Sequence, residues 1–323
     1  MEGLLLAAGA VIVTYNSEEV ILSCLDALAE MAPDVAVTVV DNASTDRTVA
    51  SVGSRSVVNP RVKLIANREN RGFAGAANQG FKITAGDPIL LLNPDVRLRT
   101  SLTPLIEACK EHGLAAGQLI APDGHAQAGF TIRRFPTPAS LAFELLGINR
   151  LWPGNPVNRH YRYLDRDLGR QGPVEQPAGA FLMARRDVWE HLGGFDEDFH
   201  PVWFEDVDFC ERAARAGYQI EYVPQVLAEH LGGHSVRKLP SARMELYWYV
   251  SLLSYAAKHF RPWPYRGVCL AAVLSTVPRT VAGIVRERNL NPVVSGCKIM
   301  RLAVERLVSR TQPAQRSRRT EKT

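Results

Sequence analysis

The chain has 323 residues, 46% of them hydrophobic, which supports a folded protein of enzyme size with a sizeable core. The formal net charge of +5 is uneven, because the residues after Val285 are strongly basic and the rest of the chain is slightly acidic. Five scattered cysteines without a C-x-x-C pair exclude a zinc knuckle and a disulfide framework, and they fit a reducing cytosol.

The opening stretch, MEGLLLAAGAVIVTYN, is apolar but does not resemble a signal peptide, because Glu2 stands where such a peptide carries positive charge. No run in the sequence reaches the ~18 to 20 apolar residues of a membrane span. We interpret the stretch as leading into a buried strand at 10–16. A helix is expected at 17–31, with Ser17 as its candidate cap.

Short β-branched runs then alternate with helical stretches, which is typical of βαβ units and a mostly parallel sheet. Strands with their exit loops are expected in 35–46, 61–70 and 88–96, helices in 72–86 and 102–113, and a short strand in 113–122. Residues 130–176 look irregular and rich in Pro, Arg and aromatic residues, which indicates an active-site surface rather than filler. Regular structure returns in 179–195 and 218–230, and long helices follow Val236.

Polar residues follow three of the expected strands, at the edge where an open α/β sheet binds its ligands. They are Thr14, Tyr15 and Asn16, then Asp41 and Asn42, then Asn93 and Asp95. Asp41 is a candidate acceptor for the N3–H of a uracil or thymine ring. The alternative is that Asp41 and Ser44 only build an Asx turn.

Asp95 ends a strand of continuous leucine, where a divalent cation such as Mg²⁺ or Mn²⁺ could bridge its carboxylate and a diphosphate. A proline-kinked turn with a solvated Asp95 is the alternative. No glycine-rich phosphate loop of a known type occurs, which disfavours a dinucleotide oxidoreductase. Arg68, Asn70, Arg71 and the small residues from Gly72 onward are nevertheless candidates for contacts with phosphate.

An acidic run, FEDVDFCE, begins with Glu205 and Asp206 directly after two large apolar residues. Taken alone, it predicts a solvated first helical turn. Asp208 and Glu211 lie one turn from Arg212 and Arg215 and are expected to cap the helix or to pair with these arginines.

Together these stretches resemble the family 2 glycosyltransferases of the GT-A fold, over roughly residues 10–235. The likeness rests on seven motifs in the family's order and spacing: VIVTYNSEE, VVDNASTDRT, NRGFAGAANQG, LLLNPDV, GAFLMARRDVWEHLGGFDEDF, FEDVDFCERAARAGY and VPQVLAEHLGGHS. The wording of NPDV, GGFDE and FEDVD is most similar to the bacterial rhamnosyltransferase-type branch. LWPGNPVNRHYR is similar to a segment of the enzymes that place rhamnose on polyprenyl-diphosphate-linked N-acetylglucosamine.

The resemblance implies a nucleotide-diphosphosugar transferase fold with a mostly parallel central sheet. It implies that Asp206 is the general base for the acceptor hydroxyl, that the reaction inverts the anomeric carbon, and that Glu205 lies behind the base or contacts the acceptor. It also implies a histidine ligand for the cation. His230 matches that position better than His234, and a structural role for the histidine is the alternative.

Two departures from the family's pattern concern the donor and the product. The usual D-x-D motif is Asn93-Pro94-Asp95 here, which suggests tolerance for a deoxyribose nucleotide such as dTDP. The Q-x-x-R-W signature of processive synthases is absent, which favours transfer of a single sugar. We expect L-rhamnose from dTDP-L-rhamnose to reach a polyprenyl-diphosphate-linked or other cell-envelope glycan acceptor. Other sugars (galactofuranosyl, glucosyl, N-acetylhexosaminyl) and a non-catalytic nucleotide-sugar-binding scaffold remain alternatives.

Two domains are expected, a catalytic domain at 1–236 and a helical, basic extension at 237–323. Pro278 and Arg279 interrupt the apolar stretch after Phe260, which therefore looks too short and broken to span a bilayer. With Trp263, Tyr265 and the basic tail it could lie in a membrane interface, and packing on the catalytic domain or on a second subunit is the alternative. We expect a cytoplasmic protein, peripheral on the cytoplasmic face of the inner membrane, with no nucleic-acid partner.

Overall fold

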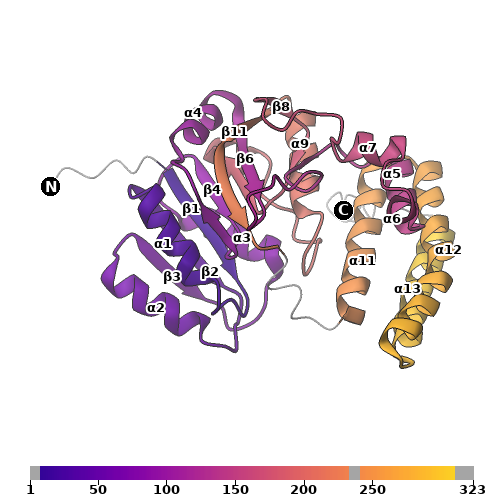
Figure 1. Ribbon diagram of the computed structural model, residues 1–323. Coiled ribbons are helices and arrows are strands. Elements are labelled where there is room, and N and C mark those ends of the chain that lie inside the picture. The colour runs from indigo at the N-terminus through magenta and orange to yellow at the C-terminus, as the bar shows by residue number, and fades with distance from the viewer. Residues whose placement is uncertain (1–7, 233–240, 310–323) are drawn as a thin grey trace, which may run out of the picture. The chain divides into compact units, whose positions relative to one another are not determined.

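The computed structural model describes residues 8–232 and 241–309, which form two compact units (Figure 1). The first unit, an α/β unit, holds the described residues of 8–135, 165–201 and 205–232. The second, a helical unit, holds 136–164, 202–204 and 241–309. The division differs from the single boundary expected at Val236, because residues 136–164 fold with the C-terminal helices.

A nine-stranded sheet forms the centre of the α/β unit, in the order β3-β2-β1-β4-β10-β6-β11-β5 with β8 paired to β11. Its strands are β1 (Ala8–Thr14), β2 (Val35–Asp41), β3 (Val62–Ala66), β4 (Ile89–Leu92), β5 (Val96–Leu98), β6 (Gly113–Ile120), β8 (Gly172–Val174), β10 (Phe181–Ala184) and β11 (Gln219–His230). Pairing is parallel from β3 to β4 and between β6 and β11, whereas β10, β5 and β8 run antiparallel to their neighbours. The expected mostly parallel α/β sheet is confirmed.

Both faces of the parallel strands are buried, which explains their continuous apolar runs. Ile12 belongs to the same hydrophobic cluster as Leu25 of α1, whereas the next residue toward the N-terminus, Val11, lies on the opposite face against Gly80 of α3. A Cβ atom at Gly80 would come within 2.4 Å of Val11 Cγ1, so only glycine lets this helix approach the sheet so closely.

The helices of the α/β unit are α1 (Ile21–Met31), α2 (Thr48–Val58), α3 (Gly72–Ile83), α4 (Thr103–His112), α8 (Arg186–His191) and α9 (Glu205–Arg215). A second, two-stranded sheet pairs β7 (Ile132–Arg133) with β9 (Gln176–Pro177). The expected cap Ser17 does not cap α1. The helix begins at Ile21, and Val20 occupies its N-cap without a side-chain hydrogen bond.

The expectation that residues 130–176 are irregular is wrong. This stretch contains α5 (Pro138–Leu145), α6 (Ile148–Leu151) and α7 (Pro156–Tyr161). Buried asparagines hold the three short helices: Asn155 donates to Asn149 Oδ1 at 3.0 Å, and Asn158 donates to the carbonyl of Pro153 at 2.7 Å. Local pattern does not reveal these helices, because polar residues occupy some of the buried positions in each of them: Ser140, Asn149 and Asn158.

The long helices of the helical unit are α11 (Ser241–His259), α12 (Pro262–Glu287) and α13 (Asn291–Val308). The interruption expected at Pro278 does not occur, since α12 continues through it. A proline inside a helix removes one backbone hydrogen bond, and the packing of α12 against α13 and α5 offsets this local cost. By length and composition α12 is the one helix among the described residues that could cross a membrane, which also corrects the expectation that this stretch is too short.

Candidate active site

The carboxyl ends of β1 and β2 meet at the buried carboxylate of Asp41. Its Oδ1 accepts hydrogen bonds from Thr14 Oγ1 at 2.9 Å and from Ser44 Oγ at 2.5 Å, and its Oδ2 accepts from the Ser44 amide at 2.9 Å. The Asx turn given as the alternative therefore forms, and it fixes the carboxylate at this sheet edge. Recognition of a nucleobase by Asp41 stays a prediction.

Two neighbouring asparagines organise the loops around this carboxylate. Asn16 has φ 50°, and its Oδ1 accepts from the amide of Thr45 at 2.8 Å. Asn42 is buried, donates to the carbonyl of Gly72 at 2.9 Å and accepts from the amide of Arg71 at 3.0 Å. These bonds bring the start of α3 to the ends of β1 and β2, as a binding loop for a nucleotide requires.

The expected phosphate-contact residues and Tyr15 lie at the rim of this edge. Tyr15 is partly buried, and Arg68 and Asn70 are exposed. Asn70 Oδ1 accepts from the Gly72 amide at 2.9 Å, and Gly72 has φ +74°, a conformation that favours glycine. Two groups predicted from the sequence, the polar strand ends and the start of α3, therefore meet in the fold.

Asp95 and His230 come together through the pairing of β5 with β11. His230 is opposite Val96 in this antiparallel ladder, and the amide of Leu231 donates to the carbonyl of Asp95 at 3.2 Å. His230 Nε2 lies 3.6 Å from Asp95 Oδ1, and both side chains are buried. The proposed ligand pair, 135 positions apart in the chain, is therefore one local cluster.

Gln127 fixes the tautomer of His230. Its Nε2 donates to the backbone carbonyl of His230 at 2.8 Å, so its Oε1 faces the ring Nδ1 at 3.0 Å. Because an amide oxygen only accepts, Nδ1 carries the proton and Nε2 keeps its lone pair. Phe130 stacks on the other side, with ring centroids 5.0 Å apart.

These residues fit a divalent cation. Among the residues that the structure describes, the buried His230 Nε2 has no hydrogen-bond partner, and it points toward the Asp95 carboxylate. Burial lowers the pKa of His230 and the nearby Asp95 charge opposes that shift, so the ring stays neutral as a ligand must. No group of three or more His, Cys, Asp or Glu gathers anywhere in the described chain, so diphosphate and water would supply the remaining ligands.

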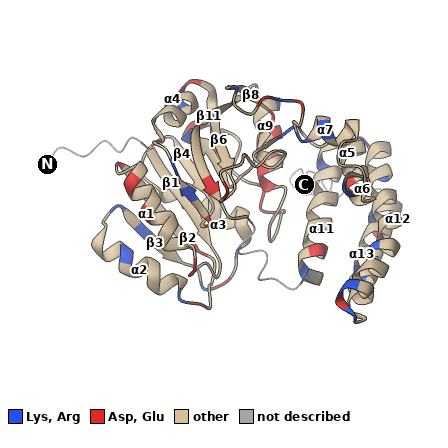
Figure 2. Ribbon diagram, viewed as in Figure 1, with Lys and Arg blue, Asp and Glu red and all other residues tan. Residues whose placement is uncertain are grey.

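Asp206 lies in the acidic first turn of α9 (Figure 2). Its Oδ2 accepts from the backbone amide of Gly179 at 2.8 Å, and its Oδ1 accepts from the amide of Val207 at 2.8 Å. Burial raises the pKa of the Asp206 carboxyl, while the two amides and the charge of Arg133 oppose this rise. A partly buried carboxylate with a raised pKa and a fixed orientation is suited to accept a proton.

The candidate base and the cation ligands belong to one framework. The amide of Gly179 donates a hydrogen bond to Asp206. The carbonyl of the next residue, Ala180, accepts a hydrogen bond from the amide of Asn93 at 3.0 Å. Asn93 in turn begins the loop that carries Asp95, and its carbonyl accepts from Val96 at 3.2 Å. Two consecutive residues just before β10 thus set the base relative to the loop that carries Asp95.

Two further acidic residues of α9 pair with arginines as their spacing predicted. Asp208 pairs with Arg212 at 2.8 Å and Glu211 pairs with Arg215 at 2.5 Å, which confirms the predicted pairing. Arg212 also donates to the carbonyls of Leu192 and Gly194, so this pair anchors α9. Glu205 is buried, with 4% of its surface exposed, rather than solvated.

Sequence reasoning missed Gln127, Gly179 and Arg133. Gln127 lies in a stretch without periodicity, and only the fold places it on His230. Gly179 stands just before an apolar strand. A glycine that no turn requires at this position could have indicated a close approach by another group. His234, the other candidate histidine, lies outside the described residues.

A mostly parallel α/β sheet with acidic and polar groups at its ligand edge, a carboxylate–histidine pair and an oriented carboxylate on a following helix defines a nucleotide-diphosphosugar transferase of the GT-A fold. A family model described as "Glycosyl transferase family 2" matches residues 10–192. One described as "N-terminal domain of galactosyltransferase" matches residues 159–232. The chain belongs to glycosyltransferase family 2 and is a glycosyltransferase, as the motifs predicted.

Relatives and solved structures agree with this assignment. The chain is 30% identical over 244 residues to an N-acetylglucosaminyl-diphospho-decaprenol L-rhamnosyltransferase of Mycobacterium tuberculosis, a match covering 71% of this chain and 77% of the relative. It is 26% identical to rhamnosyltransferase WbbL of Escherichia coli K12, covering 47% of this chain and 54% of the relative. A mannosyltransferase from Pyrobaculum calidifontis, solved with GDP-Man and Mn²⁺, has the same fold at a TM-score of 0.52 and 17% identity, covering 94% of this chain and 87% of that one.

Proposed function

We propose that this glycosyltransferase moves a single L-rhamnosyl unit from dTDP-L-rhamnose to a lipid-linked glycan acceptor of the cell envelope, with inversion of the anomeric carbon. The observation that carries the choice of sugar is the 30% identity, over 71% of the chain, to an enzyme that adds L-rhamnose to a diphospho-decaprenol-linked sugar. The geometry of Asp206 carries the choice of mechanism.

In the proposed reaction Asp206 takes the proton of the acceptor hydroxyl. The acceptor oxygen then forms its bond to the anomeric carbon while the bond from that carbon to the diphosphate oxygen breaks, and the nucleoside diphosphate leaves from the opposite face. The amides of Gly179 and Val207 hold the carboxylate, and no cationic side chain within the described ranges 8–232 and 241–309 is in direct contact with it. Asp206 therefore keeps enough basicity for this step.

The donor is proposed to lie across the carboxyl ends of β1, β2 and β4. Asp41 and Thr14 would face the nucleobase, and Asn93 would lie near the sugar of the nucleoside. Asp95 and His230 would hold one Mg²⁺ or Mn²⁺, which when bound would neutralise charge on the departing diphosphate. Two structural neighbours were solved with Mn²⁺ and a nucleotide or nucleotide sugar, which supports a cation of this kind for the shared fold.

A different donor sugar is the second candidate. It is favoured by 25% identity over 224 residues to the Low-salt glycan biosynthesis hexosyltransferase Agl10 of Haloferax volcanii, a match covering 68% of this chain and 66% of the relative. The separating experiment measures thermal unfolding with dTDP-, UDP- and GDP-sugars, each with and without Mn²⁺. A ligand at ~100 times its dissociation constant stabilises the native state by about 2.7 kcal/mol, which such a screen resolves.

Product analysis tests the rest of the proposal. The enzyme is incubated with dTDP-L-rhamnose, Mn²⁺ and a short polyprenyl-diphosphate N-acetylglucosamine, and the anomeric configuration of the product is read by NMR. We expect the configuration opposite to that of the donor. A product with the same anomeric configuration as the donor would reject Asp206 as the base of a single displacement. If another nucleotide sugar selectively stabilises the protein in the thermal screen, that sugar would replace L-rhamnose as the proposed donor. Binding of nucleotide sugar without any transfer or hydrolysis would favour the non-catalytic scaffold.

A further inference from the structure

Helix α12 presents a continuous apolar stripe to solvent. Six of its side chains, spaced three, four or seven positions apart, are 47% to 78% exposed: Trp263, Leu270, Leu274, Val277, Val281 and Val285. At 3.6 residues per turn they fall within a sector of about 80° and extend over ~33 Å of helix. We call this set the α12 stripe.

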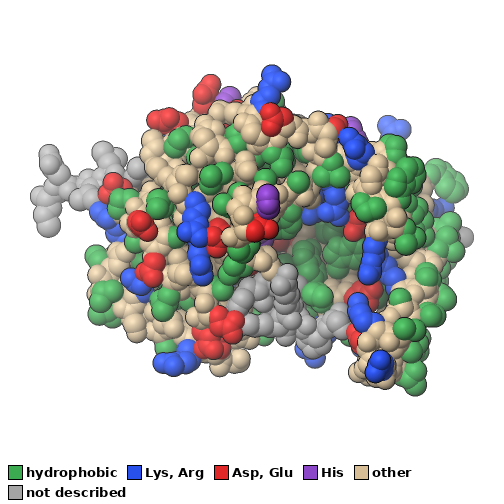
Figure 3. All heavy atoms as spheres, in the orientation of Figure 1, with side chains coloured by type: hydrophobic (Ala, Val, Ile, Leu, Met, Phe, Trp, Pro, Cys, Tyr) green, Lys and Arg blue, Asp and Glu red, His purple; other side chains and the backbone are tan. Residues whose placement is uncertain are grey.

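The opposite side of α12 is packed, so the helix has a defined orientation within its own unit. Cys269, Ala272 and Ser275 are buried there, and α12 packs against α13 and α5. Isolated exposed apolar residues are ordinary, but a contiguous apolar surface of this length marks an interaction site. Figure 3 shows hydrophobic side chains gathered on the surface of the helical unit.

Cationic side chains flank the α12 stripe. The guanidinium of Arg266 lies 5.3 Å from the ring centre of Trp263, and Arg261, Arg286 and Arg288 stand near the two ends of the helix. Aromatic and cationic residues at the margins of an apolar helical face are typical of helices that lie in a lipid interface.

The sequence beyond α13 adds charge of the same sign and contains no large apolar side chain. Residues 310–323 contain no Leu, Ile, Val, Met, Phe, Tyr or Trp. They carry five basic residues and one acidic residue: Arg310, Arg316, Arg318, Arg319, Lys322 and Glu321. An apolar stripe with basic residues around it fits a partner that has apolar groups beneath a negatively charged surface. An anionic phospholipid membrane has this chemistry.

We infer that α12 lies in the plane of an anionic phospholipid surface and inserts the α12 stripe among the lipids. The stripe would anchor the helical unit by burial of apolar area, and the flanking arginines would add attraction to anionic headgroups. The inference rests on the proposed function only in that a lipid-linked acceptor would be met at the same surface.

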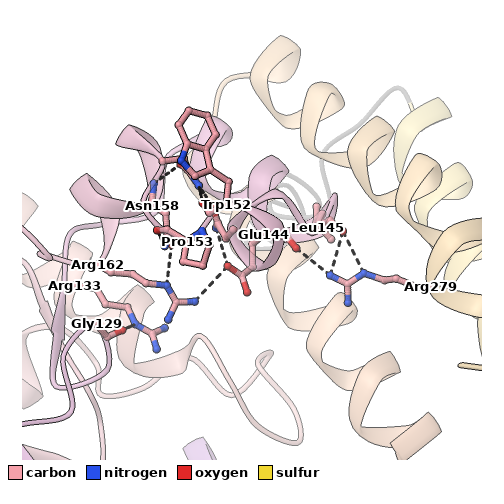
Figure 4. Close-up of polar contacts among 11 residues, drawn as sticks. Gly129, Arg133, Glu144, Leu145, Trp152, Pro153, Asn158, Arg162 and Arg279 are labelled. Atoms are coloured by element: carbon pink, nitrogen blue, oxygen red, sulfur yellow. Dashed lines mark hydrogen bonds and ion pairs between the residues drawn. The ribbon is translucent and has the colours of Figure 1, made fainter. Parts of the chain in front are cut away.

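Although α12 has the length and composition of a spanning helix, its packed side favours the in-plane arrangement. Arg279, on that side, donates to the carbonyls of Glu144 and Leu145 at 2.9 and 3.1 Å (Figure 4). The neighbouring α13 exposes Lys298 and Arg301. A spanning α12 would carry these charged groups into hydrocarbon, which is costly, whereas an in-plane helix leaves them in water.

Co-sedimentation of the full-length protein with vesicles tests the inference. Vesicles of phosphatidylcholine alone are compared with vesicles of phosphatidylcholine and phosphatidylglycerol, at low and high salt. Wild-type protein should bind the anionic vesicles, and high salt should weaken this binding without abolishing it, because salt screens charge but not apolar burial. The double variant Leu274→Glu, Val281→Glu should lose binding by about tenfold or more.

A matched control has the same chemical change elsewhere. Val57 and Val58 of α2 are 86% and 74% exposed, so Val57→Glu, Val58→Glu adds the same charge to an apolar surface outside the stripe. It should bind vesicles like wild type. Hydrolysis of dTDP-rhamnose in solution is followed in parallel. If the wild-type protein does not hydrolyse dTDP-rhamnose, the proposed function is contradicted, and vesicle binding remains an independent result.

Three results would overturn the inference. The first is wild-type protein that stays in the supernatant with anionic vesicles at low salt. The second is a stripe variant that binds as tightly as the control variant. The third is a stripe variant that turns a dimer into a monomer in solution while its vesicle binding is unchanged, which would assign the α12 stripe to a second copy of this chain.

Discussion

The backbone amide of Gly179 donates a 2.8 Å hydrogen bond to Asp206, and no side chain fits between them. A Cβ atom at residue 179 would lie 2.9 Å from the Asp206 Cβ and 3.1 Å from its Oδ2. The position of the candidate base therefore depends on the absence of a side chain 27 positions earlier in the chain. A rigid carboxylate is what proton transfer in a fixed geometry requires.

Gly179→Ala should displace Asp206 and slow sugar transfer by about 10²-fold, since a shift of ~1 Å in a reacting group has that order of effect. Donor affinity should change little, because the nucleotide residues are elsewhere on the sheet edge. Transfer rate and donor affinity are measured separately. Gly53→Ala in α2 is the matched control, because a Cβ there meets nothing within 4 Å. Equal rates for the two variants would reject this role of Gly179.

Asp206→Asn should reduce transfer by about 10²- to 10⁴-fold while donor binding persists, because the amide keeps the shape of the carboxylate but cannot accept the proton. Single-turnover transfer and binding of dTDP-rhamnose are the two measurements. Asp208→Asn is an unsuitable control, since Asp208 anchors Arg212. Asp198→Asn, at an exposed acid, serves instead. If Asp206→Asn transfers sugar at the wild-type rate, another acidic residue must be the general base.

The raised pKa of Asp206 has consequences of opposite sign for rate and stability. A base works ionised, so transfer should fall with decreasing pH through a pKa above the ordinary 3.8 of this group. The folded protein binds this proton more tightly than the unfolded chain, so protonated Asp206 favours the fold, and this stability is lost as pH rises from 3.8 through the raised pKa of the folded state. Asp206→Asn should therefore unfold at a higher temperature than wild type at neutral pH, with the difference vanishing below pH 3.8. Thermal unfolding across pH checks this, and an unchanged difference at all pH values would contradict it.

Gln127→Ala should weaken Mn²⁺ binding by about 10- to 100-fold, because the ring of His230 loses the partner that fixes its tautomer. Calorimetric titration of Mn²⁺ in the presence of dTDP measures this without catalysis. Gln225→Ala is the control, since Gln225 is exposed and bonds only Gln171 among the contacts described for it. His230→Ala and Asp95→Ala should weaken Mn²⁺ binding further. If Gln127→Ala binds Mn²⁺ as well as Gln225→Ala, Gln127 has no role in the cation site.

Asn155→Ala should destabilise the helical unit by about 2 kcal/mol. The fully buried side chain caps α7 through the amide of Asn158 at 2.8 Å and donates to Asn149 and to the carbonyl of Trp152. Removing it leaves these buried groups without partners. Denaturant unfolding measures the loss, and Asn289→Ala, at an exposed asparagine, should stay within about 0.5 kcal/mol of wild type. A similar small effect for Asn155→Ala would show that water replaces the lost bonds.

The local elements and the polar groups attached to them follow from short-range patterns in the sequence. Continuous apolar runs specify buried strands, so the strands ending at Thr14, Asp41 and Leu92 and the residues that follow them could be predicted. The spacing of Asp208 and Arg212 specifies one helical turn, and that pair forms. These features depend on neighbours within a few positions, which a sequence pattern records directly.

Which of these groups meet depends on how distant segments pair and pack in the fold. His230 reaches Asp95 because β11 pairs antiparallel with β5, and Gln127 reaches His230 through a loop without periodicity. Residues 136–164 join the C-terminal helices, and α12 continues through Pro278, because apolar packing between distant segments offsets local penalties. Strand order and packing between segments far apart in the chain are set by the energy of the whole fold, which no local periodicity encodes.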